Sequence, residues 1–251
     1  MSEKLSQSQA RAYWRGVHVA TSDDLAAVCF PDKPAYFNAF FDRIQRHAVT
    51  RALKRCSVIP SGNSVLDIGC GRGRWLDYYA ALGAVPTGLD LSPVAIASCM
   101  KRGYEAVAAS ATEMPFPDGA FDIVNCITVL LHLPPEAQER AVAEAARSLK
   151  PGGILLLIES TWKDPATHVF PRPLNDWLNL LEQHRAAAIC AEAHCFNVCR
   201  KLLDRIPANP AGVRDALAIA LDYPVEYALM AAFSGRASEF GMQHLIIARK
   251  G

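Results

Sequence analysis

The chain has 251 residues, with 26 lysines and arginines against 25 aspartates and glutamates, and a formal net charge of +1 at pH 7. That length suits one α/β domain with a modest elaboration and exceeds that of disulfide-stapled miniproteins. A hydrophobic share of 51% provides ample material for a buried core. The balanced charge argues against a nucleic acid or an acidic membrane as the main partner.

The sequence carries no pattern that would direct the chain into or across a membrane. No apolar run approaches the ~18 residues that span a bilayer, and the polar first ten residues lack the apolar core of a signal peptide. The eight cysteines are scattered without a C-x-x-C pair, which is typical of reduced and mostly buried thiols. We therefore expect a soluble, cytoplasmic protein.

The first 60 residues are predicted to form a helical cap. Apolar residues recur at helical spacing between Pro34 and Cys56, and a proline is tolerated in the first turn of a helix because its missing amide hydrogen costs nothing there. The turn-forming residues 60–63 then break the chain.

Strands and helices alternate over residues 61–160, which we expect to form a cofactor-binding core. The pattern predicts helices over 75–82, 92–103 and 134–149, and strands over 65–68, 85–89, 104–108, 121–126 and 154–158. Such alternation requires right-handed crossovers and a parallel sheet covered on both faces. With two late strands, the sequence predicts a doubly wound, mostly parallel, seven-stranded Rossmann-like α/β sheet.

The last third of the chain has a different pattern, although we expect one domain over 1–251. Residues 161–222 are helix-forming and interrupted by prolines, and they predict a helical lid insertion. Residues 223–251 are predicted to supply edge strands at Val225–Phe233 and His244–Ala248. The short link Ser234-Gly235-Arg236 favours an antiparallel hairpin between them.

The strongest chemical signal is a glycine loop that follows the first predicted strand. Asp67 precedes three glycines at alternating positions, Gly69, Gly71 and Gly73, and a helix follows. Glycine is needed where a backbone adopts positive φ or approaches a ligand closely. The third glycine comes one position earlier than in the G-x-G-x-x-G loop of dinucleotide sites. With the extra carboxylate, this compact loop favours a ligand that carries an ammonium group over one that carries a pyrophosphate.

A second acid, Asp90, ends the next predicted strand, where a carboxylate can accept hydrogen bonds from both hydroxyls of a ribose. These residues belong to five motifs at family spacing. Over about residues 60–160, the motifs resemble those of the class I S-adenosylmethionine-dependent methyltransferases. Those motifs are the glycine loop 67–73, Asp90-Leu91-Ser92 with Glu113-Met114-Pro115-Phe116, Phe121-Asp122-Ile123-Val124, Val129-Leu130-Leu131-His132-Leu133 and Leu149-Lys150-Pro151-Gly152-Gly153. The resemblance implies S-adenosylmethionine as cofactor and a lidded pocket for a small acceptor molecule.

The resemblance also assigns roles to individual residues. Gly69 and Gly71 would let the backbone approach the methionine part of the cofactor, and Asp67 would hold its ammonium directly or through water. Asp90 would bind the ribose hydroxyls. Leu91 would pack on the adenine, or alternatively belong to the core.

Five further positions match the family's cofactor pocket. Ala111 and Thr112 would edge the adenine, while Cys126 and Ile127 match the point where a backbone carbonyl meets the ammonium. Ser110 stands where the family often has aspartate; without the charge, the hydroxyl should hold the adenine amino group less firmly.

Catalytic assignments rest on fewer residues. His132 lies just past the fourth strand; as a neutral imidazole it could accept a proton from a hydroxyl or an amine, or it could instead pack the next helix. Trp14 could fold over the pocket, with Arg15 or Arg11 pairing the methionine carboxylate, although a surface helix would show the same pattern.

The reading from sequence is a methyltransferase that modifies a hydroxyl or an amine of a small metabolite. It needs no nucleic-acid, membrane or metal partner. Two alternatives remain within the family: a catalytically silent partner subunit that binds the cofactor, or a thiol- or arsenic-methylating enzyme that uses Cys190, Cys195 and Cys199. A third hypothesis is an NAD-binding oxidoreductase, which a comparison of cofactor binding would distinguish from the methyltransferase hypotheses. The sequence indicates neither the acceptor atom nor the oligomeric state.

Overall fold

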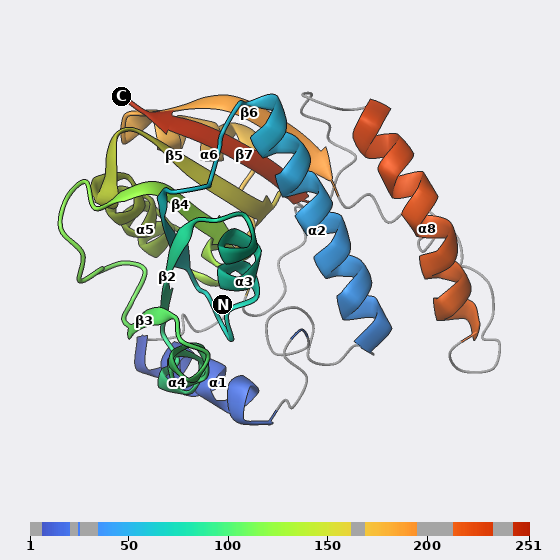
Figure 1. Cartoon of the computed structure of the whole chain (residues 1–251), viewed down its shortest axis with the longest axis horizontal. Coiled ribbons are helices and arrows are strands. Elements are labelled where there is room, and N and C mark those ends of the chain that lie inside the picture. The colour runs from blue at the N-terminus through green and yellow to red at the C-terminus, as the bar shows by residue number, and fades with distance from the viewer. Residues whose placement is uncertain (1–6, 21–24, 26–34, 162–168, 195–212, 233–242) are drawn as a thin grey trace.

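The computed structural model describes residues 7–20, 25, 35–161, 169–194, 213–232 and 243–251 (Figure 1). Seven strands in these ranges form one sheet in the order β3-β2-β1-β4-β5-β7-β6. They are β1 (Ser64–Ile68), β2 (Val85–Asp90), β3 (Glu105–Ala108), β4 (Phe121–Ile127), β5 (Leu149–Ser160), β6 (Ala186–His194) and β7 (Gln243–Lys250). The first five run parallel, and β7 is antiparallel to both of its neighbours. The predicted doubly wound sheet is confirmed.

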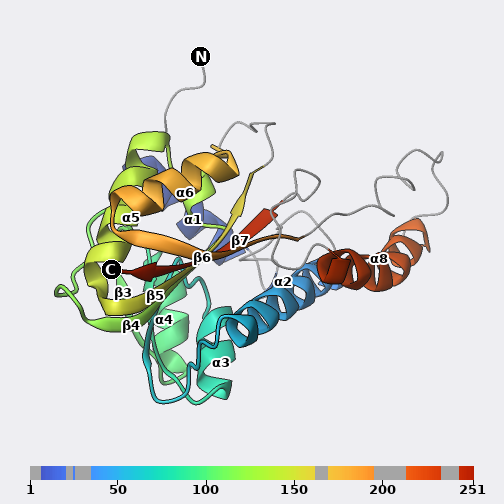
Figure 2. The ribbon, with the colours of Figure 1, turned by 90° about the horizontal axis from the view of Figure 1, so that it is seen from above.

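Helices cover both faces of the sheet (Figure 2). On one face lie α2 (Ala35–Arg55), α3 (Arg74–Ala81) and α4 (Pro93–Lys101), with α8 (Val213–Ala232) beside α2; on the other lie α5 (Pro135–Ser148) and α6 (Leu174–Gln183). Alternate residues of β5 serve the two cores: Leu156 and Ile158 pack toward α2, whereas Leu155 and Leu157 pack toward α5 and α6. Because both faces are buried, this strand is a continuous apolar run.

The N-terminal helix α1 (Gln7–Ala20) lies against α4, near the carboxyl ends of the parallel strands (Figure 1). After β1, the next two strands, β2 and β3, lie on one side of it in the sheet. The following two, β4 and β5, lie on its other side. The switch point of the sheet therefore falls between β1 and β4, where open α/β sheets bind their ligands.

Two predicted elements near the C-terminus are wrong. The strand predicted over Val225–Phe233 is wrong, because residues 225–232 belong to α8 and Phe233 lies outside the described residues. The helical prediction for 161–222 fails at Ala186–His194, which form β6. Strand β7 instead pairs antiparallel with β5 and β6, and residues 225–232 form no hairpin with it. Alanine favours helices, but pairing along β7 overrides that preference in β6. In α8, Glu226 and Met230 lie one turn apart and are buried, which outweighs the strand preference of Val225 and Tyr227.

Candidate active site

A cavity of about 120 Å³ lies at the carboxyl ends of β1, β2 and β4. Most of the predicted site residues line it: Trp14, Gly69, Gly71, Asp90, Leu91, Ser110, Ala111, Ile127 and His132. The structure therefore brings together segments that are more than a hundred residues apart in sequence.

The other predicted residues lie outside that lining. Asp67 and Cys126 are buried within β1 and β4, Gly73 precedes α3, and the Thr112 hydroxyl lies 2.8 Å from that of Ser110. Arg15 lines a separate open groove between α1 and α4 instead.

The glycine loop has the conformation that its sequence predicts. Gly69, Gly71 and Gly73 have φ values of 69°, 53° and 92°, in the left-handed region that glycine tolerates best. A Cβ atom at Gly69 would come within 2.3 Å of a methyl group of Val129 in the loop after β4. The backbone here is thus packed directly against the opposite wall of the cavity.

Asp67 has a buried carboxylate with unused hydrogen-bonding capacity. Asn125, its cross-strand neighbour on β4, donates to Oδ1 at 2.6 Å, and the Tyr79 hydroxyl donates to the Asn125 side-chain oxygen at 3.0 Å. Among the described residues, Oδ2 has no hydrogen-bond partner. Burial raises the pKa of Asp67 to about 7, against the lowering effects of Asn125 and of the Arg74 charge. A cationic ligand would stabilise the ionised form.

Asp90 ends β2 with its carboxylate bonded to backbone amides. Gly71 N–H donates to Oδ2 at 2.9 Å and Ser92 N–H donates to Oδ1 at 2.8 Å. The Leu91 amide also bonds to this carboxylate, which leaves acceptor capacity for a ligand hydroxyl. Burial raises the pKa of Asp90, while the Ser92 bond, the nearby His18 and the Gly71 bond lower it.

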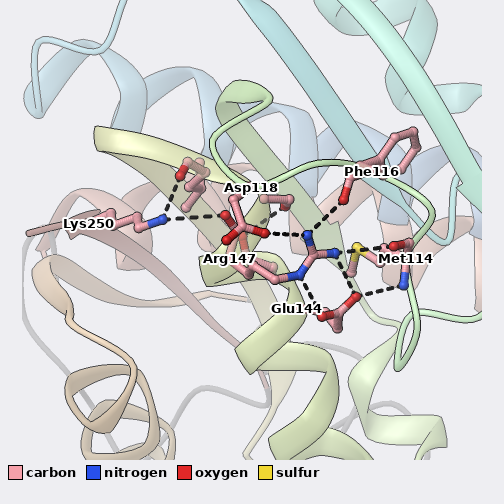
Figure 3. Close-up of polar contacts among 9 residues, drawn as sticks. Met114, Phe116, Asp118, Glu144, Arg147 and Lys250 are labelled. Atoms are coloured by element: carbon pink, nitrogen blue, oxygen red, sulfur yellow. Dashed lines mark hydrogen bonds and ion pairs between the residues drawn. The ribbon is translucent and has the colours of Figure 1, made fainter.

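Ser110 and Ala111 form part of the cavity wall. Polar contacts hold the loop that follows them in place (Figure 3). Arg147 of α5 donates to the carbonyl oxygens of Phe116 at 2.7 Å and Met114 at 3.2 Å, and it pairs with Glu144. Glu144 in turn accepts from the Met114 amide at 2.7 Å. These contacts anchor the loop beside the expected adenine position to the body of the domain.

Glu159, at the end of β5, fixes the wall that follows β4, and sequence reasoning missed it. Its carboxylate accepts from the backbone amides of Val129 at 3.2 Å, Leu130 at 2.9 Å and Leu131 at 3.0 Å. Burial raises the pKa of Glu159 to about 8, opposed by these three bonds. The only signal in the sequence was an acid that ends an otherwise apolar strand.

Thr128 was also missed. It lines the cavity with φ of 55°, although a β-branched residue rarely adopts positive φ. Its amide donates to the Ile158 carbonyl at 2.7 Å, which holds this strained residue in place. Backbone strain of this kind clusters at functional sites.

His132 ends the short 3₁₀ helix η1 (Leu130–His132) on the cavity wall. Its ring meets the Trp14 ring edge to face, with centroids 4.9 Å apart. This contact joins α1 to the loop after β4.

Cys190, the one member of the predicted thiol group that the structure describes, does not line this cavity. Cys190 lies on β6, and Arg55 of α2 contacts it with a nitrogen–sulfur distance of 2.6 Å. Cys195 and Cys199 lie outside the described residues.

Within the described ranges, no three histidine, cysteine or acidic side chains are grouped so that they could hold a metal ion. In the same ranges, no helix combines the length and apolarity that a bilayer crossing requires.

Comparison with known proteins agrees with this geometry. Residues 66–157 match the family model of a methyltransferase domain. An uncharacterized methyltransferase of Synechocystis is 34% identical over 130 residues, which are 51% of this chain and 60% of that protein. The tRNA (carboxymethyluridine(34)-5-O)-methyltransferase of Arabidopsis thaliana is 31% identical over 165 residues, 62% of this chain and 40% of that protein. The ubiquinone biosynthesis O-methyltransferase of Paraburkholderia xenovorans is 41% identical over 102 residues, 37% of this chain and 42% of that protein. In each case the chain spans less than two thirds of the relative's length.

Solved structures share the fold over the whole chain. The [4+2]-cyclase SpnF has a TM-score of 0.65 at 22% identity, covering 100% of this chain and 97% of that one. The 1,6-didemethyltoxoflavin-N1-methyltransferase of Burkholderia thailandensis, solved with its substrate and S-adenosylhomocysteine, has a TM-score of 0.62 at 18% identity, covering 100% and 92%. At such identities the likeness concerns the fold alone.

Proposed function

Because the chain belongs to the class I S-adenosylmethionine-dependent methyltransferases, we propose that it methylates a hydroxyl or an amine of a small-molecule metabolite. The observation that carries this proposal is the pair of acids at the carboxyl ends of β1 and β2. Asp67 keeps one buried carboxylate oxygen without a hydrogen-bond partner in the described part of the chain, and Asp90 lies on the cavity wall beside the glycine loop. A ligand in which a cationic amino acid is joined to a ribose would provide a hydrogen-bonding partner for each of the two carboxylates.

The residues present offer a suitable group for each part of the cofactor. Asp67 would hold the ammonium, Asp90 the ribose hydroxyls, and Leu91 with Ala111 the adenine. The close approach of Gly69 to Val129 leaves no room for a side chain at the loop. When bound, S-adenosylmethionine supplies an electrophilic methyl group on a sulfonium centre.

The protein's own contribution is to position the acceptor, exclude water and remove a proton. Proximity and desolvation accelerate a displacement that needs no covalent enzyme intermediate. The loop after β4 is held by Glu159 and presents His132 at the cavity wall. A neutral His132 would take the proton of the acceptor as the new bond to carbon forms. We further propose that segments 1–60 and 161–222 select the acceptor.

A small acceptor suits the chain better than a nucleic acid. The net charge is only +1, and an O-methyltransferase of ubiquinone biosynthesis is among the relatives. The likeness to a tRNA methyltransferase makes RNA the competitor that the experiment must include. Five of the eight cysteines lie in the described ranges and are free thiols, in keeping with a reducing, cytoplasmic location.

The proposal is tested by offering methyl-labelled S-adenosylmethionine with separate pools of phenols, amines, thiols and total tRNA. We expect label in a phenol or an amine, with stoichiometric S-adenosylhomocysteine. Label in tRNA alone, or in thiols alone, would replace this acceptor class by another. Tight S-adenosylhomocysteine binding without any transfer would favour the catalytically silent alternative.

His132→Ala is expected to lower turnover by about 100-fold or more while the affinity for S-adenosylhomocysteine stays nearly constant. The wild type should gain activity as pH rises through the pKa of the base, and His132→Ala should lose that rise. Turnover, cofactor affinity and melting temperature are measured on the same preparation. A stable His132→Ala protein with near-normal turnover would show that the residue packs the loop and carries no proton.

A further inference from the structure

The residue that most needs an explanation in the cavity is His18, which sequence reasoning did not single out. It lies on α1, one turn after Trp14, and both side chains line the cavity. Its side chain is almost fully buried, with the residue 3% exposed. Its Nδ1 atom has no hydrogen-bond partner among the described residues. A buried polar atom that no protein group satisfies is rare, because its lost hydration is not replaced.

The surroundings of His18 indicate which part of the cofactor would satisfy it. Burial lowers its pKa, the Asp90 carboxylate raises it and the Arg72 charge lowers it, so His18 is close to both charges. Asp90 is the acid placed for the ribose hydroxyls. Arg72 belongs to the glycine loop, and its guanidinium donates to the His18 carbonyl oxygen at 2.6 Å. The imidazole is therefore held beside the ribose position by the same loop that approaches the cofactor.

The size of the cavity makes contact between α1 and the cofactor unavoidable. Its volume is about 120 Å³, whereas pockets for ligands of cofactor size occupy roughly 300–1,000 Å³. Since Trp14 and His18 form one wall, a molecule of that size cannot enter without touching or displacing them. A cofactor bound in this cavity therefore lies against α1.

We infer that His18 is a cofactor-binding residue that hydrogen-bonds the adenosine part of S-adenosylmethionine beside Asp90, and that it thereby couples closure of α1 to cofactor binding. This inference rests on the proposed cofactor. A neutral imidazole can both donate and accept, which suits a ribose hydroxyl. Arg72 keeps the backbone of α1 against the glycine loop while the side chain performs this role.

The test compares two ligands that share the adenosine part. S-adenosylhomocysteine carries the amino acid, and 5′-methylthioadenosine lacks it. By calorimetry, His18→Ala should weaken both ligands by the same factor, about tenfold. His18→Gln retains a donor and an acceptor and should recover part of the affinity. Val19→Ala changes the neighbouring, 67% exposed residue of the same helix and should leave both affinities unchanged.

Hydrogen exchange of the α1 amides accompanies these measurements. In wild type, exchange in α1 should slow when 5′-methylthioadenosine binds; His18→Ala should lose much of this protection, whereas Val19→Ala should keep it. If His18→Ala loosens α1 already without ligand, His18→Gln becomes the deciding variant.

Three outcomes have distinct meanings. Unchanged affinity of His18→Ala for both ligands, with wild-type binding intact, would overturn the role of His18 alone. A loss for S-adenosylhomocysteine only would move His18 to the amino-acid end and likewise overturn the adenosine assignment. Failure of the wild type to bind either ligand would instead refute the proposed function.

Discussion

Replacing Asp90 by alanine should weaken the binding of S-adenosylhomocysteine by about ten- to a thousandfold. Each charge-assisted hydrogen bond to a ribose hydroxyl is worth about 1.5–3 kcal/mol. The carboxylate also accepts from the amides of Gly71 and Ser92, so alanine leaves two buried donors unsatisfied. We therefore expect a lower melting temperature as well.

Two further variants separate binding from stability in this experiment. Asp90→Asn keeps the shape and one acceptor oxygen, and should lose less stability than Asp90→Ala while still binding the ribose poorly. Glu105→Gln changes an exposed acid at the first residue of β3, outside the cavity lining. It should bind normally. A folded Asp90→Ala protein with unchanged affinity would show that this acid does not contact the cofactor.

The affinity for S-adenosylhomocysteine should rise with pH between pH 5 and 7 and level off above. The pKa of Asp67 is raised to about 7 by burial, so the carboxyl is mostly protonated at pH 5 in the free protein. The ligand's ammonium favours the ionised form, and binding must therefore release a proton below pH 7. Affinity should grow by up to about tenfold per pH unit in this range. Titration calorimetry in buffers of different ionisation enthalpy detects the released proton directly.

The control for this pH dependence is again 5′-methylthioadenosine, which has no ammonium. It shares the contacts with Asp90 and His18, so any titration of those groups affects both ligands, and only S-adenosylhomocysteine should show the additional slope. Asp67→Asn should abolish the additional slope and weaken S-adenosylhomocysteine selectively. Identical pH profiles for the two ligands would mean that the buried oxygen of Asp67 does not meet the ammonium.

Most of the core fold was predictable because its signals are local. The glycines need positive φ, Asp67 and Asp90 come at or next to the last residue of a strand, and a proline begins α4. Each of these constraints acts within a few residues of sequence. The candidate cavity could be predicted for the same reason, since both acids and the glycine loop lie near strand ends that a parallel sheet brings to one edge.

The predictions from sequence were wrong or incomplete where tertiary contacts determine the structure. The alanine-rich β6 has helical propensity, yet it pairs along its length with β7, which follows about fifty residues later. Asn125 meets Asp67 only because β1 and β4 are neighbours in register. Glu159 reaches amides thirty residues away, and His18 reaches Asp90 across the interface of α1 with the glycine loop. None of these pairings leaves a periodicity or a spacing in the sequence.

The likeness to a [4+2]-cyclase shows that this fold also serves proteins that are named for other reactions. The function of this chain must therefore be argued from its site. Here the cavity wall combines Asp90, the glycine loop and His132, with the buried Asp67 oxygen next to that loop in β1. This combination specifies the cofactor more closely than it specifies the acceptor.

The most direct test of the central claim is a calorimetric comparison of S-adenosylhomocysteine with NADH on the unmodified protein. The compact glycine loop and the unpartnered oxygen of Asp67 predict that S-adenosylhomocysteine binds with one site per chain and that NADH produces no binding heat. Binding of NADH without binding of S-adenosylhomocysteine would contradict the methyltransferase assignment of this site.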